Sequence, residues 1–268
     1  MSDNTPSVPT DAATLPGGGS MPLLGFGTWQ LRGASATDAT RWALDPGYRH
    51  LDNTAHIYGN EGAVGAGLAS SATERDDVFI TTKAPPDRPD ARATLQQGLD
   101  QLGCKHVDLW LIHWPSSDGL GLDAWHALID AQSDGLARDI GVSNYSLDAI
   151  DELTEATGVP PAVNQVEWSP LLFDRAVLDG HRERDVVLEG YSALRGGTLD
   201  HPEVVRIAER LGRSPAQVIV RWHLEHGVVV IPKPQQYARV VANADVGDFT
   251  LGADDVAALD ALGSAGPA

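Results

Sequence analysis

The run VFITTK (78–83), followed by ARATLQQGLDQL (91–102) and VDLWLI (107–112), decides the fold of this chain. Its first and last parts are short apolar or β-branched stretches typical of strands, and its middle part carries apolar residues on one helical face. A helix between two such strands is a βαβ unit, whose strands run parallel. The run therefore predicts a parallel sheet with helices packed against it.

The same alternation extends along the chain on both sides of this unit. Eight strands are predicted, at residues 23–27, 48–52, 78–82, 107–112, 139–142, 162–165, 186–189 and 228–231. Amphipathic helices are predicted between them, at residues 37–44, 62–69, 91–102, 122–133, 147–157, 202–211 and 215–226. Eight strands with intervening helices favour an α/β fold of the (β/α)8 barrel type over an open doubly wound sheet. No G-x-G-x-x-G follows the first strand, so a Rossmann dinucleotide site is not expected.

The length of the chain, 268 residues, fits one barrel domain of about 250 residues. Residues 1–12 are polar and carry two prolines, so we expect a flexible tail there and a single domain over residues 13–268. The triplet 17–19 is all glycine and predicts the turn of an N-terminal β-hairpin before Met21. No apolar run approaches the ~18 residues of a membrane span, and residues 1–20 lack a signal-peptide pattern. We therefore expect a cytoplasmic protein, in keeping with its single cysteine, Cys104.

The charge of the chain is strongly acidic, with 37 acidic against 19 basic residues and a formal net charge of −18. Such a surface repels nucleic acid and anionic lipid, so neither is expected as a partner. Most of the acids are aspartates, and dense short carboxylates are typical of a halophile, in which salt screens their mutual repulsion. A genome of high GC content, which favours Asp, Ala and Arg over Lys, is the alternative interpretation.

Polar residues follow the predicted strands at their carboxyl ends, where the chemistry of a (β/α)8 barrel is placed. In chain order they are Gly27-Thr28-Trp29, Asp52-Asn53, Lys83, His113-Trp114, Ser143-Asn144, Gln165, Tyr191-Ser192 and Lys233. Asp, Lys and His thus end three successive strands, and Tyr58 lies six residues beyond the Asp. We expect these four side chains to converge on one pocket.

This set of residues suits proton transfer. A phenol has a pKa near 10, so Tyr58 becomes a usable acid when a cation such as Lys83 stabilises its anion. Asp52 would hold that ammonium in place, and His113 could orient a carbonyl oxygen. Each residue alone also fits a structural role, as a buried ion pair, a packing tyrosine or a core histidine. No His, Cys or Asp grouping has zinc spacing, so no metal site is expected.

These residues stand in longer motifs that resemble the aldo-keto reductases, over residues 15–262. The motifs are MPLLGFGTWQL (21–31), GYRHLDNTAHIYGNE (47–61), VFITTK (78–83), VDLWLIHWP (107–115), GVSNYS (141–146), PAVNQVEW (161–168) and SPAQVIVRWHLEHGVVVIPK (214–233). Among subgroups the chain is most similar to prokaryotic enzymes of the 2,5-diketo-D-gluconate reductase type, also called methylglyoxal or glyoxal reductases. The resemblance implies reduction of small carbonyl substrates with NADP(H) by a monomer.

The resemblance also implies roles for individual residues. The catalytic residues would be Asp52, Tyr58, Lys83 and His113. The cofactor would contact Gly27, Thr28, Ser143, Asn144, Gln165, Tyr191, Ser192, Leu194, Lys233, Arg239 and Asn243. The substrate pocket would be lined by Trp29, His56 and Trp114. Two cations, Lys233 and Arg239, would grip the adenosine 2′-phosphate and so favour NADPH over NADH.

Three departures from the family pattern affect these expectations. The spacing from Asp52 to Tyr58 is one residue longer than usual, so either Asp52 or Asn53 could face Lys83; strand register favours Asp52. Proline at position 234 replaces the usual serine after Lys233, which weakens the expected NADPH preference and leaves room for NADH. The chain ends soon after its last helix, so we expect an open, permissive pocket.

Two other function classes remain open at this point. The first is a barrel that binds NADPH without useful turnover, in a sensory or structural role. Only the irregular spacing at Asp52 and Asn53 favours it. The second is a metal-dependent barrel hydrolase or isomerase, which would need clusters of ligands that the sequence does not contain.

Overall fold

The computed structural model describes residues 6–53, 59–86, 90–117 and 119–263. Eight parallel strands form one sheet, in which every strand neighbours the next in chain order. The strands are β3 (Phe26–Gly27), β4 (His50–Asp52), β5 (Phe79–Ala84), β6 (Val107–Ile112), β7 (Ala137–Ser143), β8 (Val163–Glu167), β9 (Val187–Tyr191) and β10 (Val229–Val230). Each of the eight predicted strands corresponds to one of these.

The sheet closes on itself where its first and last strands meet. Leu24 forms an isolated parallel bridge with Val230. The Gly25 N–H donates to the Val230 carbonyl at 2.9 Å, and the Val230 N–H donates to the Leu23 carbonyl at 2.8 Å. The predicted closed barrel is therefore confirmed. The first strand is shorter than predicted, because residues 23–25 pair only through these separate contacts.

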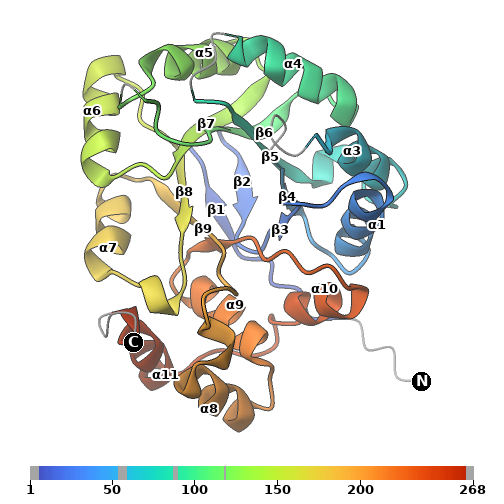
Figure 1. The fold of residues 1–268 in the computed structure, drawn as a ribbon, viewed down its shortest axis with the longest axis vertical. Coiled ribbons are helices and arrows are strands. Elements are labelled where there is room, and N and C mark those ends of the chain that lie inside the picture. Colours follow the sequence, from blue (N-terminus) through green and yellow to red (C-terminus); the bar gives the residue numbers. More distant parts are fainter. Residues whose placement is uncertain (1–5, 54–58, 87–89, 118, 264–268) are drawn as a thin grey trace.

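Helices surround the barrel (Figure 1). They are α1 (Gly33–Leu44), α3 (Glu61–Ala69), α4 (Ala91–Leu102), α5 (Leu122–Ser133), α6 (Leu147–Thr157), α7 (Arg175–Glu183), α8 (Pro202–Leu211), α9 (Pro215–Glu225), α10 (Tyr237–Ala244) and α11 (Ala253–Asp260). Three of them, α7, α10 and α11, were not among the predicted helices. Within the described residues, no helix has both the length and the apolar character that a membrane crossing requires.

The predicted N-terminal hairpin is present and lies across the middle of the ring in Figure 1. Strands β1 (Ala12–Thr14) and β2 (Ser20–Pro22) pair in antiparallel fashion. The Gly17 N–H donates to the carboxylate of Asp139, near the start of β7, at 2.7 Å. A Cβ at position 17 would lie 2.4 Å from the Arg138 carbonyl oxygen, so only glycine fits there. The hairpin thus covers the amino end of the barrel and leaves the carboxyl end for the site.

Part of the segment expected to be a tail packs on the domain. The Ser7 N–H donates to the Asp245 carboxylate at 2.8 Å. In return, the N–H groups of Val246 and Gly247 donate to the Ser7 carbonyl at 3.1 and 2.7 Å. These bonds attach the chain before the hairpin to the connection between α10 and α11.

Large apolar side chains fill the space between the barrel and the helices. Among the largest that are fully buried are Trp110 on β6, Trp125 on α5 and Trp222 on α9. Trp168 is also buried and packs edge-to-face on Phe173. Trp125, Trp168 and Trp222 thus serve packing. Because such a core is close-packed, it holds the strand ends of the barrel in fixed positions.

Candidate active site

Asp52 and Lys83 form a buried ion pair at the carboxyl ends of neighbouring strands. The Lys83 Nζ donates to both carboxylate oxygens of Asp52, at 2.7 Å to Oδ2 and 2.9 Å to Oδ1. Strand register explains the contact: Asp52 pairs with Thr81 of β5, and Lys83 lies two residues further along the same face of that strand. Both side chains are almost fully buried, so each charge depends on the other for compensation.

Asn53 faces elsewhere. Its Oδ1 accepts a hydrogen bond from the Thr28 hydroxyl at 3.2 Å, and its backbone N–H donates to the Thr81 carbonyl at 2.9 Å. The structure therefore pairs Lys83 with Asp52 and directs Asn53 toward the loop that follows β3. Two expected site residues of that segment, His56 and Tyr58, lie outside the described residues.

His113 and Trp114 follow β6 directly. The His113 N–H donates to the carbonyl of Ala84, the last residue of β5, at 3.0 Å. The His113 carbonyl accepts from the Asn144 side chain at 3.4 Å. Its ring is half-buried and lies 6.3 Å from that of Trp114, which is 48 % exposed. Both residues therefore lie at the same end of the barrel as Asp52 and Lys83.

A chain of hydrogen bonds links the expected nicotinamide residues to the ion pair. The Tyr191 hydroxyl donates to Asn144 Oδ1 at 2.9 Å, and Asn144 Nδ2 donates to the Ser143 hydroxyl at 3.0 Å. That hydroxyl donates to the Gln165 carbonyl at 2.8 Å, and Gln165 Nε2 donates to Asp52 Oδ2 at 2.8 Å. Residues from β7, β8 and β9 are thus brought together beside Asp52.

The backbone is strained at two of the expected cofactor residues. Asn144, directly after β7, has a φ of 64°, and Ser192, directly after β9, has a φ of 58°. Left-handed conformations are uncommon for residues other than glycine, and they cluster at functional sites because the surrounding fold must impose them. Both positions lie at the carboxyl end of the barrel, where the ends of the strands turn outward.

The residues expected to contact the phosphate and adenine groups of the cofactor include two that lie on α10, after strand β10, and one that lies between β10 and α10. Lys233 follows β10, and its pKa is lowered, first by partial burial and then by the nearby charge of Arg195. On α10, Arg239 is exposed, whereas the Asn243 side chain is buried. Leu194 is half-buried and packs against the core.

Gly27 and Thr28 lie between Lys233 and the Asp52–Lys83 ion pair. A Cβ at Gly27 would lie 3.0 Å from the Ile231 carbonyl and 3.6 Å from the Lys233 Cβ, so the end of β3 runs close beside Lys233. The Thr28 hydroxyl donates to the Asp52 carbonyl at 3.0 Å. Trp29 comes next and is 37 % exposed.

Two ionisable residues beneath the ion pair were not predicted from the sequence to belong to the site. Glu189 on β9 is fully buried, and burial, together with the charge of Asp52, raises its pKa to about 8. Burial lowers the pKa of His50 on β4 to about 4. The Nε2 atom of His50 lies 3.7 Å from Oε1 of Glu189, and burial favours the uncharged form of each. The signal for Glu189 was a lone acid in the apolar run VVLEGY (186–191).

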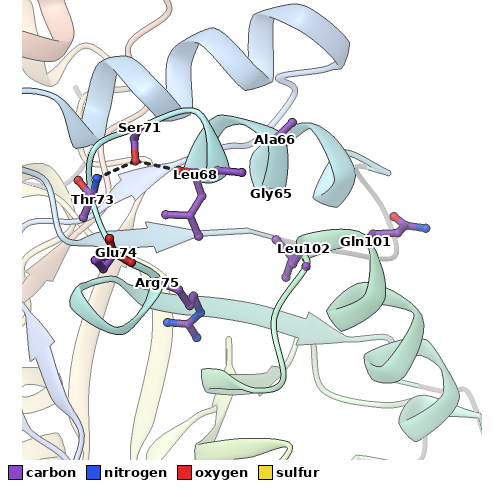
Figure 2. Close-up of a pocket in the computed structure, with 11 residues that line it drawn as sticks. Gly65, Ala66, Leu68, Ser71, Thr73, Glu74, Arg75, Gln101 and Leu102 are labelled. Atoms are coloured by element: carbon purple, nitrogen blue, oxygen red, sulfur yellow. Dashed lines mark hydrogen bonds between the residues drawn. The ribbon is translucent and has the colours of Figure 1, made fainter.

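A surface hollow of about 450 Å³ lies away from these residues, between α3 and the end of α4 (Figure 2). Its polar side chains serve local structure. The Ser71 hydroxyl donates to the Leu68 carbonyl and accepts from the Thr73 N–H. The Arg75 guanidinium, at the rim, donates to the Asp108 carboxylate at 2.9 Å. The hollow is therefore a gap between helices, and the barrel end is the better candidate for chemistry.

Comparison with known proteins agrees with this geometry. The model of the Aldo/keto reductase family matches residues 23–264. An aldo-keto reductase of Mycolicibacterium vanbaalenii is 41 % identical over 263 residues, covering 94 % of each chain. A glyoxal reductase of Bacillus subtilis is 39 % identical over 257 residues, covering 94 % of this chain and 92 % of the relative. The crystal structure of an aldo/keto reductase from Brucella melitensis superposes with a TM-score of 0.88 at 38 % identity, covering 95 % of this chain and 99 % of that one.

Proposed function

This chain belongs to the aldo/keto reductase family, and we propose that it reduces small aldehydes and ketones to alcohols with NADPH. The observation that carries the proposal is the buried Asp52–Lys83 ion pair at the carboxyl end of the barrel. It lies in one hydrogen-bonded chain with Gln165, Ser143, Asn144 and Tyr191. A fixed cation beside a set of amides and hydroxyls is what proton transfer next to a bound nicotinamide requires.

Each of the four catalytic residues has a distinct role in this proposal. Tyr58, which lies outside the described residues, protonates the carbonyl oxygen, and Lys83 makes this phenol more acidic by stabilising its anion. Asp52 keeps the ammonium of Lys83 in place. His113 donates a hydrogen bond to the carbonyl oxygen and so orients the carbonyl group. When bound, the dinucleotide supplies the hydride from C4 of its nicotinamide ring.

The donor set of the site fits a dinucleotide phosphate. Ser143, Asn144 and Gln165 offer hydroxyl and amide groups that suit the carboxamide of nicotinamide, and Tyr191 offers an aromatic face for its ring. Lys233 and the exposed Arg239 offer positive charge for a 2′-phosphate. These two cations support a preference for NADPH, and Pro234 supports some use of NADH, because proline supplies neither a hydroxyl nor an N–H.

The substrate class in this proposal is small carbonyl compounds, with methylglyoxal and 2,5-diketo-D-gluconate as candidates. A relative of similar length is a glyoxal reductase, which supports a small dicarbonyl. The reading of the chain as an NADPH-binding barrel without turnover rested on the spacing at Asp52 and Asn53. The pairing of Asp52 with Lys83 supports turnover over this alternative. Monomeric state and cytoplasmic location stay predictions.

The test is the loss of NADPH absorbance with methylglyoxal or a nitrobenzaldehyde, at low and at molar salt. The variant Tyr58→Phe should lower the rate by about 10²-fold or more, as expected when a general acid is removed. Its affinity for NADPH should stay nearly unchanged. Tyr237→Phe, at an exposed tyrosine of α10, is the matched control and should retain full rate. Full activity in Tyr58→Phe would refute the assigned proton donor.

A further inference from the structure

Two cations meet on one tryptophan at the rim of the barrel. The Nζ of Lys233 lies 5.0 Å from the centroid of the Trp29 ring, and the Cζ of Arg195 lies 5.0 Å from the same centroid. The three residues follow three different strands, namely β10, β3 and β9. Arg195 belongs to the connection between β9 and α8, and its side chain thus reaches across to the loop after β3.

This arrangement leaves positive charge without a counter-charge. Among residues 6–53, 59–86, 90–117 and 119–263, no carboxylate lies within ion-pairing distance of Arg195 or Lys233, whereas arginines elsewhere, such as Arg184 and Arg206, pair with Asp or Glu. The chain has about twice as many acidic as basic residues, so two adjacent cations without an acid are unexpected. Cation–π contact at an exposed site is a weak interaction, so it does not prevent these two cations from binding an anion.

The backbone presents Arg195 in a defined turn. Its N–H donates to the Ser192 carbonyl at 3.0 Å, and its carbonyl accepts from the Thr198 hydroxyl at 2.7 Å. Gly196 and Gly197 both have positive φ, which the turn requires. Because the backbone is held, only the exposed side chain of Arg195 needs to turn for an anion to be bound.

We propose that Arg195 binds a phosphate group of the dinucleotide together with Lys233, and that it takes over from the donor missing at Pro234. A guanidinium offers paired N–H donors that match phosphate oxygens, which the proline cannot. The inference rests on the proposed NADPH-dependent function. The phosphate is either the adenosine 2′-phosphate or the diphosphate, because both present the same chemistry to an arginine.

The test is the dissociation constant of NADP⁺ and of NAD⁺, measured by isothermal titration calorimetry on the full chain. Arg195→Gln should weaken NADP⁺ binding about tenfold, and Arg195→Lys should weaken it less because the charge remains. Arg206→Gln is the matched control: it removes the same charge from an exposed arginine of α8 that pairs with Glu203, and it should bind as wild type does. Thermal melts of the three variants check that each is folded.

The outcomes distinguish the 2′-phosphate from the diphosphate as the group that Arg195 binds. They also distinguish failure of the role of Arg195 from failure of the proposed function. A loss confined to NADP⁺ assigns Arg195 to the 2′-phosphate, and an equal loss for NADP⁺ and NAD⁺ assigns it to the diphosphate; either supports the inference. Unchanged binding of both dinucleotides by Arg195→Gln overturns it and leaves the proposed function intact. A wild-type chain that binds neither dinucleotide would overturn the proposed function as well.

Discussion

The ammonium nitrogen of Lys83 lies 2.7 and 2.9 Å from the two carboxylate oxygens of Asp52, inside the carboxyl end of the barrel. The carboxylate is held from a third direction by Gln165 Nε2 at 2.8 Å. Burial of both groups means that neither can exchange its partner for water. The position of the cation is therefore set by strand register, and we expect activity to depend on that register.

Asp52→Asn should lower both activity and stability. The amide keeps the shape of the side chain but removes the negative charge that faces the buried ammonium of Lys83, and breaking a buried pair in this way costs about 3–5 kcal/mol. Urea unfolding should show that loss, and kcat with methylglyoxal should fall at least tenfold.

Asn53→Ala is the comparison for that variant, because Asn53 is the neighbouring buried residue and bonds to Thr28. We expect about 1 kcal/mol of destabilisation, the typical effect of one lost hydrogen bond, and a much smaller change in kcat. A larger loss of activity in Asn53→Ala than in Asp52→Asn would contradict the assignment of Asp52.

Glu189→Gln should change how stability depends on pH. The pKa of Glu189 is raised to about 8 in the folded chain, against an ordinary value of 4.5, so the folded state holds one more proton between these pH values. Its stabilising contribution is complete below pH ~4.5 and is lost as the pH rises toward ~8, by at most ~1.4 kcal/mol per pH unit. Glutamine cannot ionise and removes this decline.

The measurement is urea unfolding of wild type and Glu189→Gln at several pH values from 4.5 to 8.5. The variant should gain stability relative to wild type as the pH rises. Parallel curves for the two proteins would show that the pKa of Glu189 is not raised in the folded chain.

Salt should stabilise the folded chain. With a net charge of −18, self-repulsion is strong at low ionic strength, and the screening length falls from ~10 Å at 0.1 M salt to ~3 Å at 1 M. We expect Tm to rise by about 5 °C or more between 0.05 and 2 M KCl, equivalent to ~2 kcal/mol for a chain of this size. An unchanged Tm would favour genome composition over a halophilic source as the cause of the acidity.

Most of the fold could be predicted because each strand is a short apolar run that can be recognised from its local sequence alone. Two of the helices that were not predicted, α7 and α11, carry few large apolar side chains. In α7, RAVLDGHRE (175–183), charged residues outnumber the apolar ones that pack, and in α11, ADDVAALD (253–260), small alanines replace large apolar side chains. Their positions are set by contacts with neighbouring elements, such as the bonds from Trp222 and His226 to Asp260.

In the candidate site too, some contacts could be predicted from the sequence and others could not. Lys83 and Asp52 could be predicted to meet, because parallel strands place their carboxyl ends together and period-two alternation fixes the inward face. The contact of Arg195 with Trp29 could not, because it depends on the shapes of two loops and on the direction of two long side chains. Glu189 was visible in the sequence, but its protonation follows from burial, which only the closed barrel shows.

The most direct test of carbonyl reduction by this protein is the fate of deuterium from NADPH labelled at both C4 positions of its nicotinamide ring. The wild-type chain is incubated with labelled NADPH and a nitrobenzaldehyde, and the alcohol is analysed by mass spectrometry. Hydride transfer from C4 to the carbonyl carbon predicts one deuterium on the carbinol carbon of each alcohol formed. An alcohol without deuterium, or no alcohol at all, would contradict hydride transfer to a carbonyl carbon as the reaction of this protein.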